Sequence, residues 1–397
     1  MLTTRFGSII PFRARAPLAA IALAITGLAA CGGGGNENTG GGSSTSSSST
    51  GGSGGAAPGC PAGSHPGTSA ACEATLTGWS DGPKLDTSRD HHATTVVTTP
   101  DGKSAFLLVL AGVQNSANLL KSIERASINA DGSLGAFEVE GDLPEAMAGH
   151  SIAVVGSTVI IAGGLRITGN KLVPSAKTEF AKVQADGSLS AWTEGPTMST
   201  GRFHGAMIAY KSFVYAVGGL DGDGKDNTPS VDRATVAADG TLGPWTAVTA
   251  LPGKRSHHGL AIDGNHLYVT GGLSGDPAGV ATTYDDVLQA QVNEDGSLGD
   301  WTAAGTLAVT VETHSSFVHV GQLYVVGGVE KNAYDTKHVK RAPLLPDGTI
   351  GAWENLADLP KARAHVHHTP VYGGFIYSPG GAVNHASLDD VVIGKLE

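Results

Sequence analysis

Ten of the fifteen histidines occur in short segments that precede apolar stretches. Imidazole nitrogens can bind a metal or transfer a proton near neutral pH, so such a group is a candidate for either chemistry. A residue that recurs at one place in every repeat more often serves packing, and we therefore expect no metal and no other cofactor. As ligand contacts we single out His92, His204, His258 and His367. The full set is His91, His92, His150, His204, His257, His258, His314, His365, His367 and His368.

Arginine precedes only some of these histidines. In the repeats of His150 and His314, Ala148 and Glu312 lie near the position that arginine occupies in the other repeats. In a chain with 25 basic and 36 acidic residues, arginines gathered at one place would form a cationic site for a carboxylate or sulfate. The alternative is that they connect neighbouring repeats through salt bridges, and both interpretations stay open. The four candidates are Arg89, Arg202, Arg255 and Arg363.

Other motifs for chemistry are weak. The segment Asp221-Gly-Asp-Gly-Lys-Asp226 alternates carboxylates in the manner of a calcium loop. It lacks the later bidentate glutamate, and Lys225 lies among the acids, which favours a polar surface turn. No Ser-His-Asp order, phosphate-binding loop or paired-carboxylate motif stands out.

The composition limits the class of protein. The 397 residues include 58 Gly and 19 Pro but only 15% charged residues, which favours many short strands over long helices. The 40% hydrophobic content can form a large core and excludes a wholly disordered chain. The net charge of -11 argues against a nucleic-acid partner.

The first repeated pattern is Asp-Gly-Ser/Thr-Leu/Ile, followed two residues later by an aromatic residue. Asp-Gly between apolar stretches predicts a tight hairpin turn, because glycine adopts positive φ without strain. Trp79 ends a degenerate sixth copy, so all five tryptophans occupy this one position. The five full copies begin at Asp131, Asp186, Asp239, Asp295 and Asp347.

The second pattern is a histidine followed, after about 13 residues, by Gly-Gly, with alternating apolar residues between. It predicts two strands, a and b, joined by a tight turn. A third strand, c, lies before the Asp-Gly turn and a fourth, d, follows the tryptophan. Successive histidines of this pattern are 53 to 58 residues apart, so each unit is a four-stranded blade.

Counting the units predicts a closed ring. The last unit has strand c at 388–393 but no strand d, whereas 75–85 form a strand d without partners. We therefore predict an all-β fold for residues 73–397, a six-bladed β-propeller whose sixth blade is closed by N- and C-terminal strands.

The repeat resembles the kelch repeat, with His near the start of strand a, Gly-Gly ending strand b and Trp starting strand d. The Asp-Gly turn replaces the Tyr-Asp-Pro type of turn common in kelch repeats. The resemblance implies a kelch-type propeller of the galactose oxidase central-domain type, whose members include adaptors, carbohydrate binders and a few enzymes. Galactose oxidase chemistry is disfavoured, because its copper site needs a cysteine-linked tyrosine and both spare cysteines lie outside the propeller.

The N-terminus is expected to be an export signal and a tether. Residues 1–30 have a basic start and a short apolar run, and Leu28-Ala-Ala-Cys31 resembles the lipobox of bacterial lipoproteins, which implies lipid attachment at Cys31. Gly32 by the same resemblance implies the outer membrane. Residues 31–59 form a Gly/Ser-rich linker that we expect to be disordered. Cys60 and Cys72 flank a loop at 60–72 and are expected to form a disulfide.

The long, varied loops between strands b and c, and between d and a, should lie on one face and carry the site. We expect a lipid-anchored, monomeric binding module of the cell envelope that presents this face to a glycan or to an envelope or extracellular protein. The alternative, implied by exported six-bladed kelch proteins that include sialic acid mutarotases, is an isomerase of acidic sugars. In it an arginine would bind the carboxylate and a His or Glu would transfer a proton.

Overall fold

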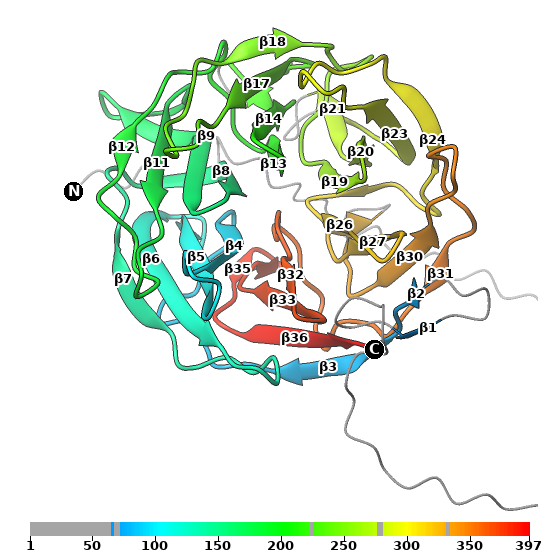
Figure 1. The fold of residues 1–397 in the computed structure, drawn as a ribbon, viewed down its shortest axis with the longest axis horizontal. Helices are drawn as coiled ribbons and strands as arrows, with labels where there is room; N and C mark the ends of the chain where they lie inside the picture. Colours follow the sequence, from blue (N-terminus) through cyan, green and yellow to red (C-terminus); the bar gives the residue numbers. More distant parts are fainter. Residues whose placement is uncertain (1–64, 67–71, 223–225, 276–280, 331–333) are drawn as a thin grey trace, which may run out of the picture. The chain divides into compact units, whose positions relative to one another are not determined.

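The computed structural model describes residues 65–66, 72–222, 226–275, 281–330 and 334–397. These residues form strands and turns, and none of them belongs to a helix that could cross a membrane. Six antiparallel sheets, five with four strands and one with five, surround a central axis (Figure 1). The predicted six-bladed propeller is therefore confirmed.

Each blade orders its strands a, b, c and d from the axis outward. Blade 1 contains β4 (Ala93–Thr98), β5 (Ala105–Gln114), β6 (Asn118–Ile128) and β7 (Glu138–Asp142). Blade 2 contains β8 (Met147–Val155), β9 (Thr158–Thr168), β11 (Thr178–Lys182) and β12 (Thr193–Glu194). Blade 3 contains β13 (Ala206–Tyr210), β14 (Phe213–Val217), β17 (Val231–Thr235) and β18 (Thr246–Val248). Blade 4 contains β19 (Gly259–Asp263), β20 (His266–Thr270), β23 (Asp286–Gln291) and β24 (Thr302–Thr306). Blade 5 contains β26 (Ser315–His319), β27 (Gln322–Val326), β30 (Val339–Pro343) and β31 (Glu354–Asn355).

Blade 6 combines both ends of the described chain. Its strands are β32 (Val371–Tyr372), β33 (Phe375–Pro379), β36 (Val391–Leu396) and β3 (Leu76–Asp81). Trp79 of β3 lies opposite Gly394 of β36, and the amide of Glu397 donates to the carbonyl of Thr75 over 2.9 Å. The predicted closure is confirmed. The last strand c begins at Val391, three residues later than predicted, because Leu388 instead forms an isolated bridge with Arg89.

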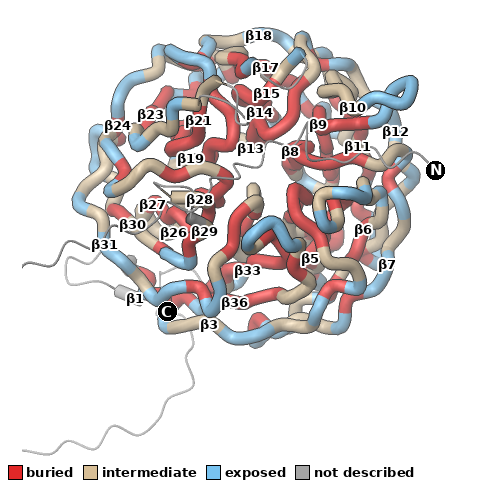
Figure 2. Tube along the Cα trace, turned by 180° about the vertical axis from the view of Figure 1, so that it is seen from behind, coloured by how far each residue is buried: buried red, intermediate tan, exposed pale blue. Residues whose placement is uncertain are grey.

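The core lies between the blades, and each of the six interfaces contains its own apolar cluster (Figure 2). Strand β14 shows how the alternation of side chains along a strand supplies two interfaces. Tyr215 and Val217 pack toward blade 4, whereas Val214 and Ala216 pack toward blade 2. This explains why the strands read as nearly continuous apolar runs, since both faces of each sheet are covered.

Short extra strands lie in the b–c connections and, for β25, in a d–a connection; both kinds of connection share one face of the ring. We call this face the loop face. In blade 2, β10 (Lys171–Pro174) extends the hairpin of β9. Elsewhere the additions are β15 (Leu220–Asp221) with β16 (Asp226–Asn227), β21 (Leu273–Gly275) with β22 (Ala281–Thr283), β25 (Val311–Glu312) with β28 (Val329–Glu330) and β29 (Tyr334–Asp335), and β34 (Ala382–Val383) with β35 (Ala386–Ser387). β1 (His65–Pro66) pairs with β2 (Cys72–Glu73) ahead of the propeller.

Candidate functional site

One residue from each blade turns toward the axis, near the start of strand a or in the segment that precedes it. All six have left-handed φ values between 52° and 64°, which is uncommon for residues other than glycine. In four of the six steps around the axis, the backbone amide of one such residue donates to the carbonyl of the one before it at 2.7–2.8 Å. These steps are Gly149 to His91, His204 to Gly149, His257 to His204 and Thr313 to His257. We call these residues the axial ring: His91, Gly149, His204, His257, Thr313 and His365.

Four side chains of the axial ring, together with His367, form one group of imidazoles. We call His91, His204, His257, His365 and His367 the axial histidine cluster. His91 stacks on His365 at 4.0 Å between ring centroids, and His204 stacks on His257 at 4.2 Å. His204 Nδ1 lies 3.3 Å from His367 Nε2, so one of these two nitrogens can donate to the other.

The environment of four members of the cluster disfavours a charged imidazole. Burial, followed by the neighbouring imidazoles, holds the pKa values of His204, His365 and His367 well below the ordinary value. Burial lowers the pKa of His257 to about 3. Within the part of the chain that the structure describes, no three or more His, Cys, Asp or Glu side chains are arranged to bind a metal ion. These four imidazoles can therefore accept or donate hydrogen bonds in their neutral form near pH 7. The fifth member, His91, has different surroundings, because its Nδ1 is paired with a carboxylate oxygen of Asp90.

The residue after the axial position has a different environment, between two blades. His258 shows the arrangement. A methyl group added at Gly272 of its own blade would lie 2.8 Å from His258 Cβ, and one added at Gly218 of the preceding blade would lie 2.9 Å from Cε1. His92 lies between Gly112 and Gly380 in the same way. The recurrence of His with Gly-Gly thus reflects close packing of an imidazole between backbones.

The histidines predicted as ligand contacts therefore belong to two classes. His204 and His367 lie in the axial histidine cluster, whereas His92 and His258 are buried between blades. Sequence reasoning listed His91, His257 and His365 as part of a ring but did not select them as contacts. Position within each segment separates most of them: His204 is itself the axial residue, whereas His92 and His258 come one place after it. His367 comes two places after His365, so the sequence offered no such signal for it.

The four predicted arginines are buried, with exposed fractions of 0–3%. Each forms an ion pair with an acidic residue that lies in strand c or immediately before strand c. Arg255 binds Asp286 through two hydrogen bonds of 2.7 and 2.8 Å. The corresponding pairs are Arg89 with Glu124, Arg202 with Asp232 and Arg363 with Asp390. The guanidinium charges are compensated inside the protein and do not form an exposed cationic mouth. Direct contact of these arginines with a ligand stays a prediction.

The ion pairs also differ from the predicted salt bridges between repeats, because both partners belong to one blade. Neighbouring blades are connected through the arginine backbone: the carbonyl of Arg255 accepts from the amide of Gly219 at 2.8 Å. Blade 2 has Met147 at the arginine position, two residues before Gly149, and there Arg166 of β9 pairs with Glu179 at 2.6 and 2.7 Å. Sequence reasoning missed the acids and Arg166. The available signal was an acid 9 to 15 residues after the glycine that ends strand b.

Several predicted sites lie wholly or partly outside the described residues. These are the signal peptide, the linker, Cys31 and Cys60, so the lipidation and the disulfide of Cys60 with Cys72 stay predictions. In the segment Asp221–Asp226, residues 223–225 are also outside. Asp226 pairs with Lys254 at 2.5 Å, and this hydrogen bond lowers the pKa of its carboxyl group.

No protein-family model matches the chain. Kelch-like protein 38 of Homo sapiens is 21% identical over 282 residues, which are 70% of this chain and 42% of that protein. Kelch-like protein terF of Aspergillus terreus is 26% identical over 266 residues, 65% of this chain and 55% of that protein. N-acetylneuraminate epimerase of Shigella sonnei is 34% identical over 94 residues, 23% of this chain and 24% of that protein. The chain thus spans between 24% and 55% of the length of these relatives.

Among solved structures, that of YjhT matches with a TM-score of 0.60 at 10% identity, covering 80% of this chain and 99% of the other. At this identity the match shows the fold alone. It agrees with the six blades described above.

Proposed function

Because the chain is a kelch-repeat propeller of six blades, we propose that it is a binding module of the cell envelope whose loop face contacts a glycan or a protein partner. The observation that supports this proposal is the contrast between the two faces. The opposite face repeats the same Asp-Gly turn in five blades, whereas the loop face differs from blade to blade. Varied segments on a rigid scaffold are the usual place for recognition.

The hairpin of β9 and β10 is the most distinctive part of the loop face. Ile167 in this hairpin has an exposed fraction of 60%, although it is a large aliphatic residue. Leu172 of β10 lies opposite Ile167 and is half-buried. A projecting hairpin with an exposed aliphatic side chain provides apolar contact area for a partner.

A matched pair of variants tests the proposed face. Val139 of β7 has the same exposed fraction of 60% but lies on the outermost strand of blade 1. We expect Ile167→Ser to weaken binding of residues 60–397 to the best ligand of a glycan array or a panel of purified envelope proteins by about tenfold, as loss of a buried apolar contact does. Val139→Ser should leave binding unchanged. Equal effects of the two variants would contradict the loop face as the binding surface.

The alternative function is an isomerase acting on an acidic sugar, and the local similarity to N-acetylneuraminate epimerase favours it. Against it, the four predicted arginines are each paired with an acid, and the imidazoles with lowered pKa values are buried. The deciding measurement is anomer exchange of N-acetylneuraminate followed by NMR. Exchange faster than in buffer, lost in His204→Ala and His367→Ala but kept in Val139→Ser, would establish the enzyme.

We also propose that lipid on Cys31 anchors the module and that residues 31–59 keep it clear of the membrane. Only the thiol of a lipobox cysteine accepts the lipid, so Cys31→Ser should abolish labelling by palmitate and release the protein from the membrane fraction. Retained label on this variant would exclude lipid attachment at Cys31.

A further inference from the structure

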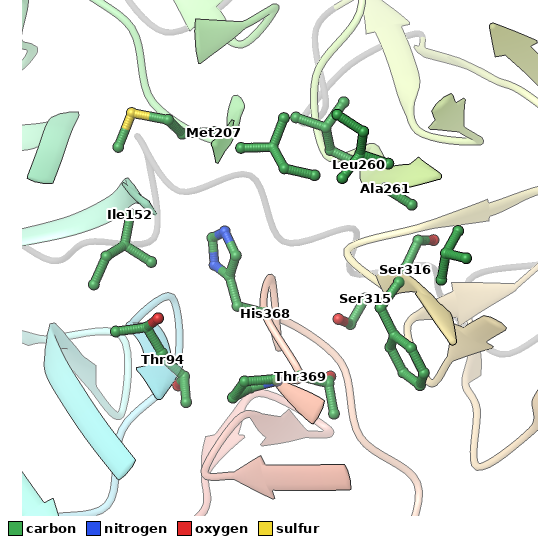
Figure 3. Close-up of a pocket in the computed structure, with 15 residues that line it drawn as sticks. Thr94, Ile152, Met207, Leu260, Ala261, Ser315, Ser316, His368 and Thr369 are labelled. Carbon is green, nitrogen blue, oxygen red and sulfur yellow. The ribbon is translucent and has the colours of Figure 1, made fainter. Parts of the chain in front are cut away.

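A cavity of about 260 Å³ follows the axial histidine cluster along the inner strands (Figure 3). Its wall includes the residue three places after each member of the axial ring, one from every blade. We call these the lining ring: Thr94, Ile152, Met207, Leu260, Ser316 and His368. The cavity is thus a regular feature of the six-fold arrangement, but its chemistry differs from blade to blade.

The two halves of the lining ring are chemically unlike. Ile152, Met207 and Leu260 from blades 2, 3 and 4 form an apolar half. Hydroxyl groups and one imidazole from blades 5, 6 and 1 form the other half, and Figure 3 shows His368 extending into the space between them. An apolar wall with a few polar groups on one side is typical of small-molecule sites.

Three polar atoms of the second half are buried and have no hydrogen-bond partner among the residues that the structure describes. They are Thr94 Oγ1, His368 Nδ1 and Thr369 Oγ1. A buried polar atom without a partner is unfavourable, so such groups are normally satisfied by a ligand or by water. All three belong to residues that line the cavity, so each is a candidate to hydrogen-bond a polar group bound there.

The cavity contains no ionised side chain. None of the 15 residues around it is Asp, Glu, Lys or Arg. Burial lowers the pKa of His368 to about 4, so this ring is neutral near pH 7. Transfer of a charged group into such surroundings without a partner is costly. A carboxylate or sulfate is therefore excluded from this cavity.

Access is from the face opposite the loop face. The axial histidine cluster lies at one end, next to lining residues such as Ile152 and Met207 that are buried. Toward the far ends of the inner strands, Ile208, Ile262 and Val318 are half-buried, so the cavity reaches solvent there. This site is consequently independent of the loop face and of its proposed function.

The geometry points to a binding site for a small uncharged molecule that has an apolar body of one or two rings and one hydroxyl or carbonyl group. A cavity of about 150 Å³ holds benzene, so the larger volume here accommodates a two-ring body. The body would contact Ile152, Met207 and Leu260. Its polar group would lie at Thr94, His368 and Thr369.

Three probes with the same ring system test this site by calorimetry and fluorescence on residues 60–397. We expect 1-naphthol to bind about two- to tenfold more tightly than naphthalene, because one hydrogen bond contributes about this much to binding. We expect 1-naphthalenesulfonate not to bind. No binding of 1-naphthol up to 1 mM would show a cavity filled by water only and overturn the proposal. Equal binding of the sulfonate would overturn it as well.

Two variants connect binding to the cavity. Met207→Trp fills the apolar half and should abolish binding of 1-naphthol. Thr94→Val keeps the side-chain volume and should remove most of the preference for 1-naphthol over naphthalene, whereas Thr193→Val on exposed β12 should not. Thermal melting checks that each variant is folded. If Met207→Trp does not fold, Thr94→Val still tests the proposal. An unchanged preference of this variant for 1-naphthol over naphthalene would contradict hydrogen bonding of the ligand by the polar half of the cavity.

Discussion

Arg202 and Asp232 show what a single ion pair does in this propeller. Both side chains are almost fully buried, and the guanidinium also donates to the carbonyls of Gly218 and Ser230 at 3.2 Å. One arginine thus connects the segment before strand a with strands b and c of its blade. A buried pair of this kind contributes little relative to two apolar residues, but losing one partner leaves an uncompensated charge.

At this residue scale we expect Arg202→Ala to destabilise the domain by about 3–5 kcal/mol in urea unfolding, because Asp232 then loses its partner in a buried position. Replacing both residues, Arg202→Met with Asp232→Leu, should recover most of this loss. Lys84, whose pair with Asp389 is largely exposed, provides the control, and Lys84→Ala should not change the midpoint measurably. A small effect of Arg202→Ala would instead favour a role in ligand contact.

The buried histidines give a second prediction, on pH. Burial lowers the pKa of His150, His257 and His314 to about 3, below the value of about 6.5 in an unfolded chain. In this range the unfolded state binds more protons, so stability present above pH 6.5 is lost as the pH falls toward 3. Each such histidine contributes a slope of up to about 1.4 kcal/mol per pH unit.

The measurement is the free energy of unfolding between about pH 7.5 and 5.5, a window above the ordinary pKa values of carboxyl groups, about 3.9–4.3. We expect a steady decline below pH 6.5 and a smaller slope in His150→Leu, which lacks one titrating group. A flat profile in this window would show that the imidazoles take up protons in the folded state.

At the scale of elements, the Asp-Gly turn connects blades. Gly296 in the turn of blade 4 lies against the ring of Phe213 in blade 3, and its carbonyl accepts from the hydroxyl of Tyr215 at 2.7 Å. In blade 1, Gly132 lies against Phe375 and accepts from Tyr377 in the same way, at 3.0 Å. Trp301, just after the turn, donates to the carbonyl of Thr249 in the segment after blade 3. The repeated turn is therefore an interface between sheets and not only a hairpin.

Alanine variants at two glycines distinguish the free-energy cost of backbone strain from that of steric contact. Gly296 has φ +78°, and an added Cβ would lie 2.8 Å from Phe213, whereas Gly264 has φ +53° and open space. Both alanine variants should lose about 1 kcal/mol through strain, and Gly296→Ala about 1–3 kcal/mol more through overpacking. Chemical unfolding measures both losses. In a Phe213→Ala background the additional loss should vanish, and its persistence would contradict the contact.

At the scale of the whole molecule, stability depends on closing the ring. Blade 6 obtains strand d from β3 near one end of the described chain and strand c from β36 at the other. The cluster toward blade 5 includes Leu76 and Leu396, and the cluster toward blade 1 includes Leu85 and Ile393. Removing β3 would leave β36 as an unpaired edge and open two interfaces.

We therefore expect deletion of residues 75–85 to lower the melting temperature strongly or to prevent folding. Deletion of residues 40–55, which lie in the Gly/Ser-rich linker, should leave the melting curve unchanged. Both are measured by circular dichroism on otherwise identical chains. Similar melting curves for the two deletions would contradict the closure.

Features that repeat along the chain could be predicted from the sequence. The recurring Asp-Gly turns, the tryptophans and the Gly-Gly pairs determine the number of strands, the number of blades and the closure by Trp79. These follow from the sequence because turns and strand alternation depend on neighbouring residues: glycine adopts positive φ locally, and side chains alternate along any strand.

Only the tertiary structure decided the environment of each functional residue. His257 and His258 are adjacent in sequence, yet one reaches the axis and the other lies between blades, because the left-handed backbone at His257 is held by hydrogen bonds from other blades. The acids that neutralise the arginines lie about 30 residues away, and the lining ring combines six distant segments. Such contacts depend on how the sheets pack around the axis, which is a property of the closed ring and not of any one repeat.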